Sequence, residues 1–273
     1  MDKRAKYPGQ VVDFGRGVLY PHEHAAIAHL DRRAPSTAMA RFVEFYWHVR
    51  WRTDEPYETK VLSHPNVHLV FEEPAPLVYG VDRSLFVRRL EGRGQVLGVK
   101  FRPGCFRPFA DGPVIDLADR RVPAATVFPR RVDEVGRAIL QSTGLDAMVR
   151  LAEEFLLDDD VLPAPDPVAE EVAAMVETIT ADPALFRVDQ AAGTLHVSAR
   201  TLQRLFAEYV GASPKWVLRR ARLHEAASRA DEGVRVDWAA LADDLGYFDQ
   251  SHLTRDFTAT VGVSPAKYAG LSS

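Results

Sequence analysis

The sequence predicts an α+β protein of two domains, a β-rich N-terminal domain followed by an all-α C-terminal domain. Its 273 residues exceed the usual length of one domain, and 47% of them are apolar, which is enough to form a core in each half. Short alternating apolar segments fill the first half, whereas apolar residues recur at helical spacing in the second. We place the N-terminal domain at 1–157, a linker at 158–167 and the C-terminal domain at 168–273.

The first half contains segments that are typical of β-strands. They are marked by Phe45, Trp47 and Val49, by Val67, Leu69 and Phe71, and by the apolar run 96–101. We interpret the residues between or beside such segments as turn residues, namely Pro74, Pro76, Gly80, Gly92, Gly94, Gly104 and Gly112. Many short strands at near-regular spacing predict a small antiparallel barrel or sandwich.

From residue 132 to 157 the apolar spacing becomes helical, and Gly144 interrupts it. This predicts one or two helices that close the first domain. Their apolar face either covers the core of that domain or forms a dimer seam. The segment 158–167 then combines three consecutive acids with three prolines, which exclude helix continuation and predict a linker.

The C-terminal part contains one sequence unit twice, at 188–216 and 236–268. Leu202, Phe206, Gly211, Ser213 and Pro214 recur 51 positions later as Leu253, Phe257, Gly262, Ser264 and Pro265. The Val-Asp pair at the front of each unit is offset by only 48. We therefore expect the turn of the second unit to be three residues longer.

Each unit has the plan of a helix-turn-helix. The helices are expected at 189–194 and 199–209 in the first unit, and at 237–245 and 250–261 in the second. Paired alanines at 191–192 and 239–240 are small enough for the next helix to cross closely. Ser198 and Asp249 are suited to cap the second helix of each unit.

The second helix of each unit is the candidate recognition helix, since its apolar residues form one inward stripe. The outward residues are Arg200, Thr201, Gln203, Arg204 and Glu208 in the first unit, and Gln250, Ser251, Thr254, Arg255 and Asp256 in the second. Arginine can donate twice to guanine, glutamine can pair with adenine, and hydroxyls reach bases or phosphates. Polar residues would also be expected on any solvent-exposed helix face. However, the same arrangement occurs in both units, each followed by Gly-x-Ser-Pro, which favours DNA recognition over a merely solvated surface.

Between the units, residues 214–230 predict one continuous helix about 24 Å long. It would hold two reading heads near the spacing of one DNA turn, about 34 Å. Its basic residues Lys215, Arg219, Arg220, Arg222 and Arg229 are expected to be exposed. The candidate phosphate contacts are Ser198, Thr201, Lys215, Arg219, Arg220 and His252.

Residues 182–269 resemble the DNA-binding domain of the AraC/XylS transcription regulators. The resemblance rests on Ser-x-Arg-Thr-Leu-Gln-Arg-Leu-Phe at 198–206, on Leu-Gly-Tyr-Phe-Asp-Gln-Ser-His-Leu-Thr-Arg-Asp-Phe at 245–257 and on Gly-x-Ser-Pro at 262–265. It implies seven helices, two subdomains joined by the long helix, and recognition helices in successive major grooves. The base contacts that it implies are Arg200, Gln203 and Arg204, and Gln250, Ser251, Thr254 and Arg255, with Arg204 and Arg255 at equivalent places.

Residues 79–120 resemble the β-rich sensor domains attached to a subgroup of this family. This implies a cupin-like barrel with a helical tail that can dimerise. It names no ligand and no effector-binding residue.

The net charge of the whole chain argues against nucleic-acid binding, because 34 basic and 38 acidic residues give −4. However, residues 198–230 hold seven basic and two acidic groups. We therefore expect site-specific DNA binding with little non-specific background at physiological salt. No apolar run spans a membrane, no secretory signal is present and the single cysteine excludes an intrachain disulfide, so a cytoplasmic location is expected.

Three other hypotheses compete. His22 and His24, and His64 and His68, fall at short spacings that could suit a metal. Cys105 could accept alkyl groups in DNA repair, although its expected role is that of a small buried hydrophobe. The helical repeat could also be a protein-interaction module.

The sequence thus favours a sequence-specific DNA-binding transcription regulator, with no enzymatic activity, no cofactor and no metal. The expected partners are double-stranded DNA, RNA polymerase, a small-molecule effector and a second copy of the chain.

Overall fold

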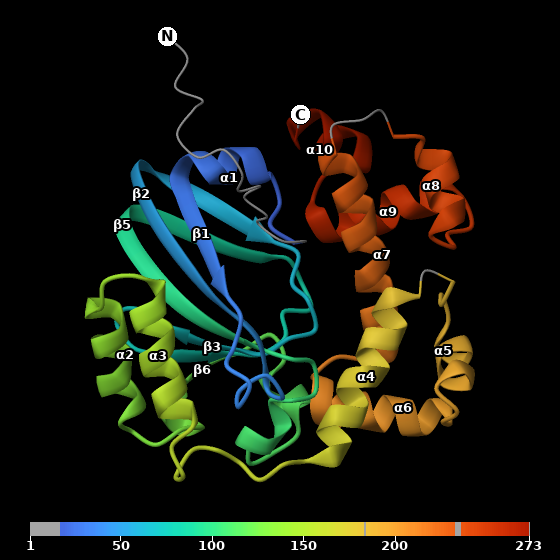
Figure 1. The fold of residues 1–273 in the computed structure, drawn as a ribbon. Helices are drawn as coiled ribbons and strands as arrows, with labels where there is room; N and C mark the ends of the chain where they lie inside the picture. The colour runs from blue at the N-terminus through green and yellow to red at the C-terminus, as the bar shows by residue number, and fades with distance from the viewer. Residues whose placement is uncertain (1–16, 183, 233–235, 273) are drawn as a thin grey trace.

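The computed structural model of the chain describes residues 17–182, 184–232 and 236–272. Figure 1 shows a curved sheet with two helices on its outer side, and beside it an entirely helical part. The predicted fold class is therefore confirmed, with a β-rich N-terminal part and an all-α C-terminal part.

The N-terminal part contains one antiparallel sheet in the order β1-β2-β5-β3-β4-β6. Its strands are β1 (Ala28–Arg33), β2 (Val43–Val61), β3 (His68–Phe71), β4 (Leu77–Tyr79), β5 (Phe86–Phe101) and β6 (Arg121–Pro123). Among the described residues β1 and β6 form the two edges, so the barrel-like sheet is open. The shorter elements are α1 (Pro21–Ile27) and three turns of 3-10 helix, η1 (Arg107–Phe109), η2 (Val114–Leu117) and η3 (Ala124–Thr126).

The long strands β2 and β5 determine the two faces of the sheet. Side chains alternate along a strand, so Tyr46 and His48 are buried on the face opposite to that of Phe45, Trp47 and Val49. The β2–β5 register shifts between Thr53 and Tyr57, a stretch that includes Pro56, which has no N–H to donate. Gly92 and Gly94, which we expected in turns, lie within β5 and pair with β2.

Helices α2 (Val132–Gln141) and α3 (Leu145–Leu156) close this part, and Gly144 between them adopts a left-handed conformation with φ of 87°. Helix α2 contacts β3 and β5, and α3 contacts β1. Ile139, Met148 and Phe155 are buried there. The apolar face of these two helices therefore covers the core of the N-terminal part, the first of the two roles expected for it.

The C-terminal part contains seven α-helices within the described residues, as the resemblance implied. They are α4 (Pro167–Ala181), α5 (Val188–Thr194), α6 (Ala199–Leu205), α7 (Pro214–Asp231), α8 (Trp238–Asp244), α9 (Gln250–Val261) and α10 (Pro265–Ser272). None of them, and no other helix in the described ranges, has the length and apolar character needed to cross a lipid bilayer.

One hydrophobic core extends from the sheet through α4 to the first helix-turn-helix, while a second cluster joins α8, α9 and α10 to α7 and to Leu19 and Leu62. Helix α4 begins at Pro167 because Asp166 accepts hydrogen bonds from the backbone N–H groups of its first turn. Between the parts, the sulfur of Cys105 in the N-terminal part lies 3.9 Å from the carbonyl oxygen of Ala169 in α4. The two parts are thus in extensive contact. The linker predicted at 158–167 stays a prediction.

Candidate nucleic-acid interface

The two helix-turn-helix units share one turn geometry. In the first, the N–H of Val197 donates to the carbonyl of Ala192 at 3.0 Å, and in the second Tyr247 donates to Ala242 at 2.9 Å. A left-handed residue precedes each donor, His196 with φ of 53° and Gly246 with φ of 67°. The two turns share this hydrogen bond, and α9 begins one residue further after its donor than α6 does.

This equivalence corrects two expectations about the repeat. The turn between α8 and α9 is one residue longer than that between α5 and α6, not three, because α8 begins two residues later relative to the Val-Asp pair. The buried pair that matches 191–192 is Leu241 and Ala242, whereas Ala239 and Ala240 are exposed. The spacing of alanines alone therefore misaligned the first helices by two residues.

Caps begin both recognition helices. The hydroxyl of Ser198 accepts from the backbone N–H of Thr201 at 3.0 Å, and the carboxylate of Asp249 accepts from that of His252 at 2.7 Å. Ser198 and Thr201 also share a hydrogen bond between their hydroxyls at 2.8 Å. Each cap satisfies an N–H that the helix would otherwise leave unpaired, so both helices begin where the sequence predicted.

The first recognition helix differs from its prediction at its end. It is α-helical only as far as Leu205, and a π-helical turn, η4 (Phe206–Val210), follows it. The N–H of Gly211 donates to the carbonyl of Phe206 at 2.9 Å, and Gly211 is left-handed with φ of 82°. This wider turn lies against η2 of the N-terminal part. The expected single α-helix over 199–209 is therefore wrong after Leu205.

The predicted base-contacting side chains lie on the outer faces of α6 and α9. Arg200, Gln203, Arg204, Gln250, Ser251 and Arg255 are exposed, and Thr254 is half-buried. Beneath them Leu202, Phe206, Leu253 and Phe257 are buried. The structure therefore separates an apolar inner stripe from a polar outer face in both helices.

The predicted phosphate contacts divide into two groups. Ser198, Lys215 and His252 are exposed, and Thr201 is half-buried. Arg219, on α7, is half-buried and pairs with Asp256 of α9, its Nε lying 2.5 Å from Oδ1. The other oxygen of Asp256 accepts from the hydroxyl of Tyr247 at 2.8 Å. Asp256, which we expected to point outward, therefore links α9 to α7, and its side chain is only 14% exposed.

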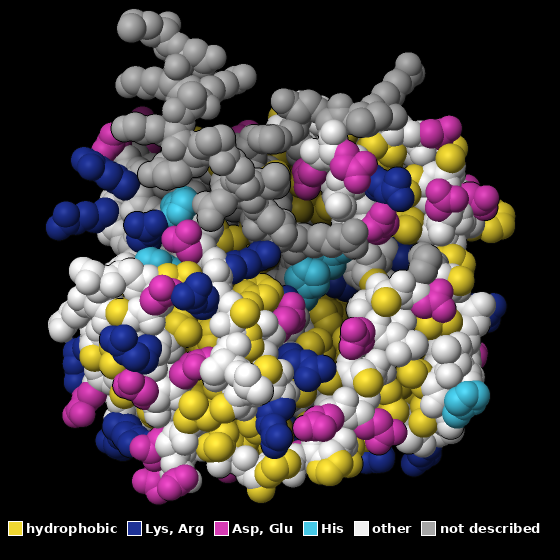
Figure 2. Space-filling view, viewed as in Figure 1, with side chains coloured by type: hydrophobic (Ala, Val, Ile, Leu, Met, Phe, Trp, Pro, Cys, Tyr) yellow, Lys and Arg dark blue, Asp and Glu magenta, His cyan; other side chains and the backbone are white. Residues whose placement is uncertain are grey.

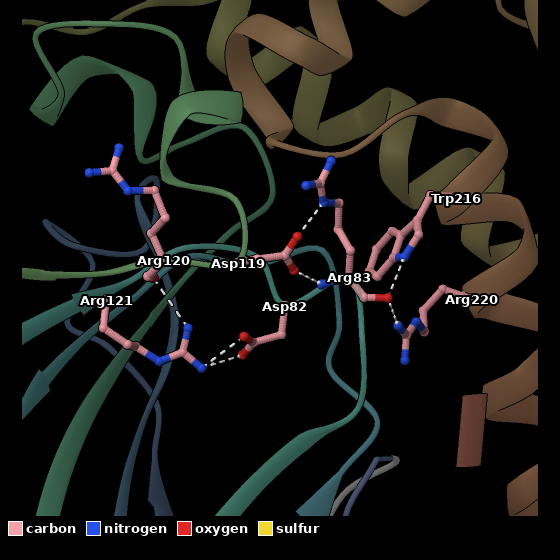
Figure 3. A network of polar contacts seen from close by, with 7 residues as sticks. All are labelled: Asp82, Arg83, Asp119, Arg120, Arg121, Trp216 and Arg220. Carbon is pink, nitrogen blue, oxygen red and sulfur yellow. Dashed lines mark hydrogen bonds and ion pairs between the residues drawn. The ribbon is translucent and has the colours of Figure 1, made fainter. Parts of the chain in front are cut away.

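Arg220 contradicts the expectation of an exposed phosphate contact, because it is only 2% exposed. Its NH2 donates to the carbonyl oxygen of Arg83, in the N-terminal part, at 2.8 Å. The indole N–H of Trp216 donates to the same oxygen at 3.1 Å, and the guanidinium lies 4.6 Å from the centre of that ring (Figure 3). Burial lowers the pKa of Arg220 to about 10, which leaves it charged at neutral pH.

Further contacts hold Arg83 in place. Asp119 accepts from its backbone N–H and from its Nε, both at 2.7 Å. The neighbouring Asp82 accepts two hydrogen bonds of 2.8 Å from Arg121 (Figure 3). We call the set Arg83, Asp119, Trp216 and Arg220 the latch. The contact between Trp216 and Arg220 could have been predicted from the sequence, since the two residues are four apart on one helix face.

The face of the sheet that carries Phe45, Trp47 and Val49 lines a cavity of about 200 Å³. His68 lines it too, and its Nδ1 accepts a hydrogen bond of 3.1 Å from the indole N–H of Trp47. Gly80 and Asp82 form part of the wall, directly before the latch residue Arg83. The cavity and the latch therefore share one loop.

The histidines of the metal hypothesis do not converge. Thr59 hydrogen-bonds Nδ1 of His24 at 3.2 Å, and the ring of His64 stacks on that of His224 with centres 3.9 Å apart. Nδ1 of His68 is engaged by Trp47, and the side chain of His22 lies outside the described residues. Across the described ranges, no three or more His, Cys, Asp or Glu side chains are grouped as a metal site requires.

Cys105 is 1% exposed, as expected of a small hydrophobe. Burial raises the pKa of its thiol to about 11, so little thiolate forms at neutral pH. This disfavours the hypothesis of alkyl transfer to this sulfur.

Comparison with known families separates the two parts. Residues 191–270 match a family described as a helix-turn-helix domain. The C-terminal part is an AraC-type helix-turn-helix domain. Residues 31–123, which precede the AraC-type domain, match a family described as a domain of unknown function, DUF6597. The protein is thus a DNA-binding transcription regulator.

No curated protein matches the chain. Among solved structures, the chain is similar to an AraC-type transcriptional regulator of Chromobacterium violaceum at 21% identity, over 38% of this chain and 92% of that one, with a TM-score of 0.34. An apo variant of ToxT from Vibrio cholerae is similar at 12% identity, over 88% and 100% of the two chains, with a TM-score of 0.43. Wild-type ToxT with bound unsaturated fatty acid is similar at 10% identity over 94% and 96%, with a TM-score of 0.37.

Proposed function

We propose that the protein is a sequence-specific regulator that reads two successive major grooves with α6 and α9. The observation that carries this proposal is that Arg204 and Arg255, which occupy equivalent places in the repeat, are both exposed on capped recognition helices. The 18-residue helix α7, about 27 Å long, joins the two helix-turn-helix units. Reading heads in successive major grooves would lie about 34 Å apart, one DNA turn.

The proposed base contacts are Arg200, Gln203, Arg204, Gln250, Ser251, Thr254 and Arg255. Ser198, Thr201, Lys215 and His252 would contact phosphates, and Arg219 would do so by exchanging Asp256 for a phosphate. Arg220 belongs to the latch in this arrangement and would reach a phosphate only after the latch opens. Figure 2 shows basic and acidic side chains interspersed over one face of both parts, which fits recognition by a few specific contacts.

Arg204→Ala and Arg255→Ala should each weaken operator binding by about 1 to 3 kcal/mol and relax specificity at one base pair. The operator is first mapped by footprinting upstream of the protein's own gene and its neighbours. Affinities are then measured by fluorescence titration, with thermal unfolding as a check on the fold. Unchanged affinity in Arg204→Ala would contradict the assignment of α6.

Lys215→Ala is the matched comparison because Lys215 is exposed at the start of α7 but is proposed to contact phosphate only. It should weaken binding to all sequences alike and reduce the slope of affinity against salt concentration. Loss of sequence preference in this variant would assign it to base reading instead.

The cavity and the latch support control by a small-molecule effector. A ligand that moves Gly80 and Asp82 in the cavity wall would also move the neighbouring carbonyl oxygen of Arg83, to which Trp216 and Arg220 donate. Because these donors lie on α7, which joins both reading heads, the effector would alter the placement of α6 relative to α9.

Arg220→Gln should lower the free energy of unfolding by about 1 to 3 kcal/mol, since it removes a buried charged hydrogen bond. It should also raise operator affinity in the absence of effector, because α7 loses one of its two hydrogen bonds to Arg83 of the N-terminal part. Arg229→Gln on the same helix is the control, as Arg229 is exposed and pairs with Glu225, one turn earlier on α7. Equal effects of the two substitutions on unfolding and on operator affinity would exclude the latch.

Contact with RNA polymerase and assembly into a homodimer are part of the same proposal, and both can be tested by co-sedimentation with operator DNA. The apolar faces of α2 and α3 are buried within the N-terminal part, so a dimer would use another surface. We propose that the protein acts by binding alone, without catalysis or cofactor.

A further inference from the structure

We propose that the cavity of the sheet binds an uncharged aromatic molecule that accepts a hydrogen bond from Nε2 of His68. This inference rests on the proposed effector function and specifies the chemical class of the effector. It follows from the shape of the cavity wall, from the pairing of its charges and from the position of one proton.

Two tryptophans and two glycines shape the wall. Trp47 pairs with Gly98 across β2 and β5, and Trp51 pairs with Gly94. A Cβ atom added to Gly98 would lie 1.9 Å from the ring of Trp47, and one added to Gly94 would lie 2.2 Å from that of Trp51. The glycines therefore let both indoles lie directly against the backbone of β5. Both rings line the cavity, which favours a flat aromatic ligand.

The charged side chains around the cavity are already matched by protein groups. Nζ of Lys100 lies 2.9 Å from Glu44, NH1 of Arg88 lies 2.6 Å from Glu72, and Asp82 is paired with Arg121 at 2.8 Å. The guanidinium of Arg32 lies 4.7 Å from the centre of the Phe45 ring. A charged ligand would have to displace one of these partners, whereas an uncharged ligand would leave them in place.

His68 supplies the polar contact. Its Nδ1 accepts the hydrogen bond from Trp47, so the proton of the neutral ring is on Nε2. Among the described residues no partner accepts from this Nε2. Burial, with Lys100 nearby, lowers the pKa of His68 to about 3, so the ring stays neutral at physiological pH. A ligand acceptor at this nitrogen would satisfy the donor.

The cavity volume limits the size of the ligand. At about 200 Å³ it exceeds the roughly 150 Å³ of an engineered apolar cavity that holds benzene. One aromatic ring with a short substituent therefore fits. Acetophenone has this shape and a carbonyl acceptor, α-methylstyrene replaces that oxygen with a CH₂ group, and benzoate carries a charge in the same place.

Calorimetric titration of the full chain with these three probes tests the inference. We expect acetophenone to bind about tenfold more tightly than α-methylstyrene, and benzoate to bind most weakly. His68→Phe should reduce the difference between acetophenone and α-methylstyrene to less than about twofold. His48→Phe is the matched control, because His48 is a buried histidine of the same sheet but lies on its other face. It should leave the difference unchanged.

Equal affinities for acetophenone and α-methylstyrene in the wild type would overturn the inference, and so would preferred binding of benzoate or no binding of any probe. These outcomes need no variant, so they hold even if His68→Phe does not fold. Operator titration without a probe tests DNA reading separately. If acetophenone binds as expected but leaves operator affinity unchanged, the effector function fails while the site stands.

Discussion

Phe257→Ala is expected to lower the free energy of unfolding by about 3 to 5 kcal/mol, the usual cost of emptying a buried phenylalanine site. Phe257 is 0% exposed, and its ring centre lies 5.6 Å from that of Tyr268. Both belong to the small cluster that joins α8, α9 and α10 to α7. Because Tyr247 and Tyr268 are the only other buried aromatic side chains of this cluster among the described residues, the second reading head should lose its structure first.

Chemical denaturation followed by circular dichroism measures this loss, and footprinting should show protection of one half-site only. Phe248→Ala in the same motif is the control, since Phe248 is 92% exposed and should change stability by less than about 0.5 kcal/mol. Similar destabilisation by both substitutions would contradict the packing of α9 described above.

Acidification from pH 6.5 to about pH 5 should destabilise the protein by about 2 kcal/mol through His68 alone. An unfolded histidine binds a proton near pH 6.5, while the folded ring of His68, with a pKa of about 3, does not. Between these values the unfolded state binds more protons, so stability falls as the pH falls. Burial, with His64 and Arg220 nearby, also lowers the pKa of His224, which adds to the effect in the same direction.

Urea unfolding at several pH values between 7.5 and 5 measures the slope. In His68→Phe the slope should be reduced, and the difference from the wild type isolates His68 because all other groups titrate in both proteins. A slope that is the same in the variant and the wild type would show that His68 becomes protonated in the folded state.

The helical half could be predicted closely because its signals are local. Ser198 and Asp249 cap helices at the predicted residues, and the Leu and Phe positions of both recognition helices are buried. The exception is the alanine pair at 239–240, which was expected to be buried but is exposed. The hydrogen bonds of the turns, rather than the Val-Asp pairs, determine which residues correspond, and those bonds pair 192 with 242.

What the sequence could not predict depends on contacts between distant segments. Arg220 looked like one more cation on a solvated helix, but the carbonyl that it binds lies 137 residues away. Gly94 looked like a turn residue because glycine is common in turns. Its actual role, room for Trp51 on the facing strand, requires the register of β2 and β5. Neither partner can be identified from local spacing.

If the proposed effector acts through the π-helical turn behind α6, its binding is thermodynamically linked to that of the operator. Helix α6, directly before this turn, carries residues proposed to read DNA, while Glu208 within the turn pairs with Arg107 of the N-terminal part at 2.6 Å. If an effector changes operator affinity by some factor, the operator must change effector affinity by the same factor. Promoters with strong operators would then respond to the effector at different concentrations from promoters with weak ones, without any change in the protein.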